Sequence, residues 1–86
     1  MSSGTISGAQ VRAARALLGW TVHELAHRSI VSIVTIHEIE ESAAAPSTHA
    51  DDLVAIQAAL KSAGIEFLDG AAPGVRLRPK ARRRDR

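Results

Sequence analysis

Residues 19–40 read GWTVHELAHRSIVSIVTIHEIE, and this stretch decides the fold of the chain. Gly19 can take the left-handed conformation that ends a preceding helix. Thr21 and Glu24 form the pattern T-x-x-E, in which the two side chains satisfy free backbone N–H groups at the start of a helix. The pattern therefore predicts a short helix over residues 21–29.

A second helix is expected directly afterwards, over residues 32–41. Ser32 is a favoured N-cap residue, and Ile36 and Ile39 follow at a spacing that places both side chains on one helical face. Two short capped helices with a break of a few residues, supported by a helix on each side, form the helix-turn-helix arrangement.

The sequence also predicts the two supporting helices. Ser7 and Gln10 form another capping pattern before apolar residues at helical spacing, which indicates a helix over residues 7–18. Regularly spaced apolar side chains predict a fourth helix over residues 48–63, and Gly64 is expected to end it.

A β-hairpin is expected after the last helix. The short β-prone segments 65–68 and 75–78 flank a stretch rich in Gly and Pro, which is typical of a turn. Alternation of apolar and charged residues predicts that one face of the hairpin buries Phe67, Val75 and Leu77.

Length and composition agree with one small helical domain. The chain has 86 residues, and alanine-rich, aromatic-poor sequences (aromatic content 2%) favour helices over a β-sandwich. We therefore expect a mainly α fold, with four to five helices around a helix-turn-helix core and a short C-terminal β-hairpin. This domain is expected to cover residues 6–78, followed by a disordered basic tail over residues 79–86.

Composition also excludes several classes of protein. Without cysteine, the chain cannot form disulfide scaffolds, cysteine-based zinc fingers or a thiol active site. No apolar run approaches the roughly 18 residues of a membrane span. The opening MSSGTISG has neither a basic nor an apolar stretch, so we expect no signal peptide and a cytoplasmic location.

The net charge of +2 hides a strong asymmetry along the chain. Residues 76–86 contain seven Lys or Arg and one acidic residue, whereas residues 1–75 contain four Lys or Arg and eight acidic residues. A basic tail on an acidic body is typical of attraction to nucleic acid. The alternative is a solvated tail that only aids solubility.

The central stretch resembles the phage-repressor-like (Cro/repressor type, XRE-like) helix-turn-helix family of bacterial transcriptional regulators. The flanking sequences ISGAQVRAARALLGW and LVAIQAALKSAGIEFLDGAAPGVRLR are similar to the family's first helix and to the C-terminal part of a small bacterial subgroup. The resemblance covers residues 6–78. The matching positions are Gly19, Trp20, Thr21, Glu24, Leu25, Ala26, Arg28, Val31, Ser32, Thr35, Ile36, Ile39 and Glu40.

Three departures from the family pattern concern the DNA-facing side. Val22 replaces a Gln that usually contacts a phosphate, and Ile30 replaces the turn Gly. Because a β-branched residue disfavours a positive φ, either the turn is reshaped or this position is strained. Residues 32–42 contain three Glu and no Lys or Arg, whereas the family usually offers cations or Gln to base edges.

The resemblance implies that the helix at about 32–41 reads the major groove of double-stranded DNA. Ile33 and Val34 would contact thymine methyl groups, and Glu38 would accept a hydrogen bond from a cytosine amino group. His37 or Thr35 would bond a base edge. Three arginines outside this helix would hold the phosphate backbone. The predicted DNA-binding residues are Thr21, Arg28, Ser32, Ile33, Val34, Thr35, His37, Glu38, Arg12 and Arg15.

The function expected is therefore that of a bacterial, DNA-binding transcriptional regulator, a repressor or autoregulator, without enzymatic activity. A homodimer through residues 65–78 is expected, because one such module contacts few bases and the hairpin offers an exposed edge. The alternative is a helix-turn-helix-derived protein-interaction module, antitoxin-like or anti-activator. It would bind DNA weakly or not at all and have a second regulatory protein as its partner.

His23, Glu24 and His27 also read H-E-x-x-H, the zinc-binding pattern of metalloproteases. The helix-turn-helix pattern already accounts for Glu24, and no downstream motif supplies a third ligand. A domain of this size also lacks walls for a peptide cleft. We therefore expect no metal, no cofactor and no catalytic residue.

Overall fold

The computed structural model describes residues 6–41, 49–68 and 73–78 of the chain. In this part, four helices precede a two-stranded hairpin, which confirms the mainly helical fold expected from the sequence. None of these helices is long and apolar enough to cross a membrane. The predicted tail, residues 79–86, lies outside the described part. The elements are α1 (Gly8–Leu18), α2 (Val22–Ser29), α3 (Ile33–Glu41), α4 (Ala50–Ser62), β1 (Ile65–Leu68) and β2 (Gly74–Leu77).

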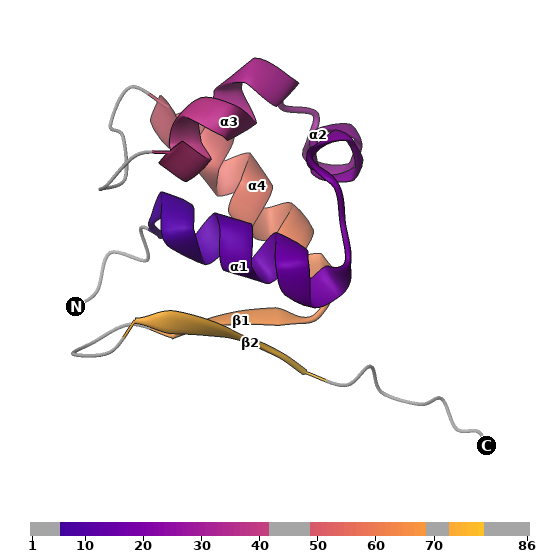
Figure 1. Ribbon diagram of the computed structural model, residues 1–86, viewed down its shortest axis with the longest axis vertical. Coiled ribbons are helices and arrows are strands. Elements are labelled where there is room, and N and C mark those ends of the chain that lie inside the picture. The colour runs from indigo at the N-terminus through magenta and orange to yellow at the C-terminus, as the bar shows by residue number, and fades with distance from the viewer. Residues whose placement is uncertain (1–5, 42–48, 69–72, 79–86) are drawn as a thin grey trace.

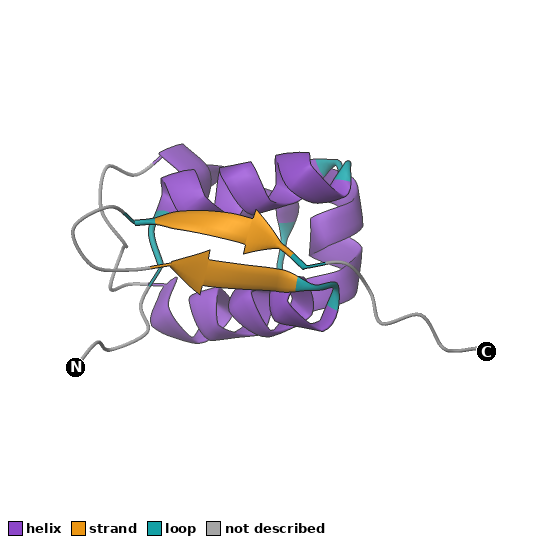
Figure 2. Ribbon diagram, turned by 90° about the horizontal axis from the view of Figure 1, so that it is seen from below, coloured by secondary structure: helices purple, strands orange, loops and turns teal. Residues whose placement is uncertain are grey.

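The hairpin and α3 lie on opposite sides of α1 (Figure 1). Helix α1 packs against α3 and α4 on one side and against β2 on the other, whereas α4 packs against α2 and β1. Seen from below, the two strands lie side by side along the helical layer (Figure 2). The fold is therefore a helical cluster with α3 near one surface and the hairpin on the opposite surface.

The predicted capping signals form as local structure. The side chains of Ser7 and Gln10 make a complete capping box at α1, and Gly19 ends that helix in the left-handed conformation with φ 70°. At α2, the Thr21 hydroxyl accepts a hydrogen bond from the Glu24 N–H at 3.0 Å. The Glu24 carboxylate pairs with Arg28 rather than reaching back to Thr21, so only the first half of this capping box is present.

The core is one cluster of aliphatic side chains contributed by all four helices and β1. Leu25, Ile36 and Ile39 of the central stretch are fully buried, as their spacing predicts. These side chains fix the inner faces of α2 and α3. The buried core residues are Ile6, Val11, Ala14, Leu25, Val31, Ile36, Ile39, Leu53, Ile56, Leu60 and Ile65.

The hairpin is antiparallel, with Ile65 opposite Leu77 and Phe67 opposite Val75. Ile65 is buried, and Phe67 and Val75 pack against the core while staying partly exposed. The prediction that Leu77 is buried is wrong, because its side chain is 38% exposed. Leu77 lies over Gly64, which has no side chain to cover it.

Candidate nucleic-acid interface

Helices α2 and α3 are joined by three residues, Ile30 to Ser32, and we call residues 21–41 the α2–α3 unit. Figure 1 shows α2 nearly end-on while α3 runs across the view, so the two helices cross steeply. The inner side of the unit is held by buried aliphatic side chains. The outer side of α3 is consequently available at the surface.

The turn between the helices depends on an unusual conformation of Ile30. This residue has φ 59° and ψ 41°, and it is the only non-glycine residue with a positive φ in the described part of the chain. The left-handed region costs a non-glycine residue about 1–2 kcal/mol. The sequence left open whether the turn is reshaped or Ile30 is strained, and the structure has the strained residue. The Ile30 side chain is 86% exposed, so no packing offsets the strain.

The outer face of α3 begins apolar and becomes acidic toward its end. Val34 is 66% exposed, and His37, Glu38 and Glu41 are exposed as well. Of the predicted base-contacting residues, Ile33 and Thr35 are half-buried. The structure thus places four of the side chains on this helix where a ligand can reach them.

The hydroxyl groups at the start of α3 are used within the protein. The Ser32 Oγ accepts a hydrogen bond from the Thr35 N–H at 3.1 Å and donates to the Thr35 Oγ1 at 2.9 Å. Ser32 therefore caps the helix as predicted. Two of the three hydroxyls that the sequence offered to DNA, those of Ser32 and Thr35, therefore already bond to each other.

Glu38 also has a partner. Its Oε1 lies 2.9 Å from Nε2 of His49, the residue just before α4. A contact between Glu38 and a cytosine amino group would therefore compete with the link between α3 and α4.

Arg15 and Arg12 connect α1 to the end of α3. The Arg15 Nε and Nη2 donate to the two Glu40 carboxylate oxygens at 2.8 and 2.9 Å, and the hydrogen bond to Glu40 raises the pKa of Arg15. Arg12 Nη1 donates to the Glu40 backbone oxygen at 2.8 Å. Two of the three arginines predicted to hold phosphates thus have partners in the protein. The negative charge of Glu40, which would repel DNA, is compensated by the positive charge of Arg15.

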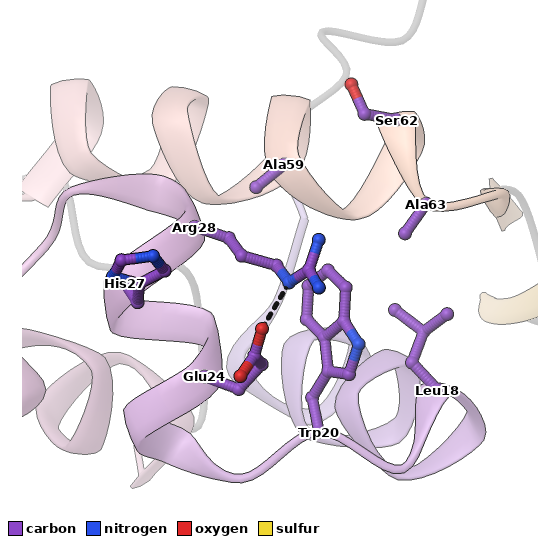
Figure 3. A pocket seen from close by; sticks show the side chains of 8 residues that line it. All are labelled: Leu18, Trp20, Glu24, His27, Arg28, Ala59, Ser62 and Ala63. Carbon is purple, nitrogen blue, oxygen red and sulfur yellow. Dashed lines mark hydrogen bonds and ion pairs between the residues drawn. The ribbon is translucent and has the colours of Figure 1, made fainter.

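The third predicted arginine, Arg28, pairs with Glu24 and lies over the Trp20 ring, 4.6 Å from its centroid. Figure 3 shows these side chains along a shallow groove of about 840 Å³ between α2 and α4. Trp20 also packs against the core. Because Arg28 covers its ring, this groove is better explained by packing than by a stacked ligand. The remaining lining residues are Leu18, His27, Ala59, Ser62 and Ala63.

The H-E-x-x-H pattern lies on α2 with both histidines exposed. Its Glu24 is engaged by Arg28, and no three His, Asp or Glu side chains gather into a metal-binding group among the described residues. Nothing in this part of the chain adds a third ligand to His23 and His27.

The cations of the hairpin lie away from α3. On the outer face of the hairpin, Glu66 bonds to Arg76 and to Arg78, and these hydrogen bonds lower the pKa of the Glu66 carboxyl. Because the hairpin and α3 are on opposite sides of α1, Arg76 and Arg78 lie on the side opposite α3 (Figure 1).

Sequence reasoning missed two connections that hold this interface in place. Gly8 touches α3 so closely that a Cβ there would lie 1.9 Å from the Ile39 carbonyl oxygen. Gln10 donates from Nε2 to the carbonyl oxygens of Leu68 and Gly74 at 3.1 and 2.9 Å. A glycine at the first turn of a helix was a visible signal for the close approach, whereas the role of Gln10 toward the hairpin had no local signal.

Comparison of the chain with models of protein families and with curated proteins finds no match.

Proposed function

We propose that the protein is a DNA-binding transcriptional regulator that places α3 in the major groove and acts as a homodimer. The observation that carries this proposal is the steep crossing of α2 and α3, with the inner face of α3 anchored and its outer face uncovered. A helix presented in this way can enter the major groove while its partner helix crosses the phosphate backbone.

On electrostatic grounds, we assign sequence selectivity to α3 and general DNA affinity to the tail. Arg15 compensates the charge of the buried Glu40, so α3 is less repulsive to phosphate than its sequence implies. Nevertheless, residues 32–42 supply no cation, so α3 contributes selectivity and little general affinity. In this proposal, the tail contacts phosphates whatever the base sequence of the DNA is. Its cations are Lys80, Arg82, Arg83, Arg84 and Arg86.

This division is tested by titrating duplex DNA at two salt concentrations with the full chain and with a variant in which the five tail cations are Gln. We expect the tail variant to lose affinity equally on all sequences. Its salt slope should fall by up to about 0.9 per lost phosphate contact. A His37→Ala variant should instead change the preference among sequences. If the full chain binds no duplex at low salt, the protein-interaction alternative replaces the proposal.

We place the homodimer interface of the hairpin at the outer edge of β1. The outer face is charged by Glu66, Arg76 and Arg78, which disfavours apolar packing there. A shallow groove of about 450 Å³ also follows β1.

Hydrogen-bond alternation leaves backbone groups of β1 available at this edge. Because the Arg78 N–H donates to the Gly64 oxygen, the alternating pattern of an antiparallel ladder turns the backbone groups of Ile65 and Phe67 outward. These outward groups can pair with β1 of a second copy. Phe67→Asp should therefore give monomers in light scattering, and Phe67→Leu should remain dimeric. A wild-type chain that is monomeric at high micromolar concentration contradicts the dimer.

A further inference from the structure

His49 lies in a different setting from the other three histidines of the chain, which are exposed. Its side chain is 23% exposed, and its Nε2 atom lies 2.9 Å from Oε1 of Glu38 on α3. Although His49 is the residue before α4, its side chain makes no cap hydrogen bond to that helix. The ring of His49 therefore connects the start of α4 to α3 instead of capping α4.

This contact can change its charge without being broken. An ionised carboxylate only accepts hydrogen bonds, so Nε2 of His49 donates and Oε1 of Glu38 accepts. An additional proton would then bind to Nδ1, the other ring nitrogen, and the pair would change from one net negative charge to none. Histidine is the side chain that ordinarily makes this change between about pH 5 and 8.

Other titratable groups lie on the two helices that the contact connects. On α3, the exposed His37 and Glu41 are neighbours of Glu38. On α4, Asp51 and Asp52 occupy the first turn. Carboxylates ordinarily keep their charge above about pH 5, whereas a histidine does not. The titration of His37 therefore has to be separated from that of the contact.

The helices α1 and α2 contribute cations that do not vary with pH. On α1, Arg12 and Arg15 both bind Glu40 near the end of α3. On α2, Arg28 lies beside the last turns of α4, at the opposite end of that helix from His49. Because arginine stays charged at all these pH values, none of these groups changes the charge of the contact.

Glu38 lies on the face of α3 that the proposed function directs into the major groove. Val34, Glu38 and Glu41 are exposed and recur at the spacing of one helical face. A carboxylate beside a neutral imidazole repels phosphate, whereas a carboxylate paired with a protonated imidazole carries no net charge. DNA therefore favours the protonated form of His49, and by linkage a proton on His49 favours DNA binding.

We propose that His49 is a positioning residue that makes DNA binding by α3 depend on pH. A proton taken up by its ring neutralises the Glu38 carboxylate, so binding strengthens as pH falls from about 8 to 5.5. The proposal rests on the DNA-binding function inferred above. It gives that function a regulator, the proton, and a residue outside α3 that responds to it.

The contact itself is tested first, on the full chain without DNA. The carboxyl carbon resonance of Glu38 should shift in the same pH range as the ring resonances of His49, because the new proton lies within the same pair. In His49→Gln that shift should disappear, since glutamine keeps an N–H donor for Glu38 but takes up no proton. The matched control is His37→Gln, which should leave the shift in place.

Duplex binding then measures the effect on function. The probe is one duplex selected from a randomised library by the full chain, and its affinity is measured at about pH 5.5 and 8 at constant ionic strength. We expect the wild type to bind more tightly at the lower pH, and we expect this gain to be about fivefold smaller in His49→Gln. Such a factor corresponds to one unit-charge interaction at about 4 Å in bulk water. At the higher pH, where the imidazole is neutral, the variant should match the wild type.

Three results would overturn the inference and leave the regulator proposal in place. In the first, the Glu38 resonance does not follow the titration of His49. In the second, the full chain binds the duplex with the same pH dependence in the wild type and in His49→Gln. In the third, His49→Gln loses affinity equally at both pH values, which is the result of a merely structural role. If no duplex is bound at low salt at either pH, both proposals are wrong.

Discussion

The Arg15 guanidinium and the Glu40 carboxylate form two parallel hydrogen bonds, Nε to Oε2 at 2.8 Å and Nη2 to Oε1 at 2.9 Å. The remaining Arg15 Nη1 donates to the Trp20 carbonyl oxygen at 3.1 Å. One side chain on α1 thus holds both the end of α3 and the segment that leads into α2. This contact fixes the orientation of the α2–α3 unit, on which the proposed function depends.

We predict that Glu40→Gln destabilises the protein, because it leaves the Arg15 charge without its partner. Removing one partner of a buried pair costs about 3–5 kcal/mol, and we expect the lower end because the Arg15 side chain is 19% exposed. Urea unfolding measures the change. The control is Glu41→Gln on the same helix, where the side chain is exposed and the change should stay within about 0.5 kcal/mol. Equal effects of the two substitutions would contradict this role.

Gly8→Ala should destabilise the protein although alanine is the better helix former. Helix propensity favours alanine over glycine by about 1 kcal/mol. The new Cβ, however, would lie 1.9 Å from the Ile39 carbonyl oxygen, so α1 and α3 must move apart. We expect a net loss of about 2 kcal/mol in thermal or urea unfolding. Gly74→Ala is the control, because nothing lies within 4 Å of a Cβ at that position.

A Gln10→Glu substitution should loosen the hairpin in a pH-dependent way. The donor that bonds the Leu68 and Gly74 carbonyl oxygens would become a carboxylate that faces them. This environment favours the protonated carboxyl and raises its folded pKa, so the stability of the variant should fall as pH rises through that pKa. Thermal unfolding between pH 4 and 8 measures the effect. Gln57→Glu on α4 makes the same change of charge and should show a weaker pH dependence.

Acid should weaken the charged cluster on the outer face of the hairpin. The hydrogen bonds from Arg76 and Arg78 lower the pKa of Glu66. A lowered folded pKa means that the contribution to stability is present above the unfolded pKa and is lost as pH falls through the folded pKa. NMR titration of the Glu66 carboxyl should give a pKa below the ordinary value. In Arg76→Gln the pKa should be higher, and an unchanged value would show that Arg76 does not hold the carboxylate.

The elements of the fold were predictable because their signals are local. Ser7 with Gln10, Gly19, and Thr21 with Glu24 act within one helical turn, so the sequence predicts where α1 ends and α2 begins without knowledge of the rest of the chain. The candidate site was predictable only in part. The sequence correctly places Val34, His37 and Glu38 on the surface of α3, but it did not predict that the Ser32 and Thr35 hydroxyls bond to each other.

By itself, the sequence determined the order of the helices, the hairpin, the apolar faces of the helices and the charge asymmetry, since each follows from periodicity, capping or composition. Only the tertiary structure decided which side chains meet. Arg15 and Glu40 are 25 residues apart, and Gln10 lies 58 and 64 residues from the two carbonyl oxygens that it binds. Such pairs depend on how whole elements pack. The same packing leaves Ile30 strained and exposed, because the α2–α3 turn requires a left-handed residue whatever side chain stands there.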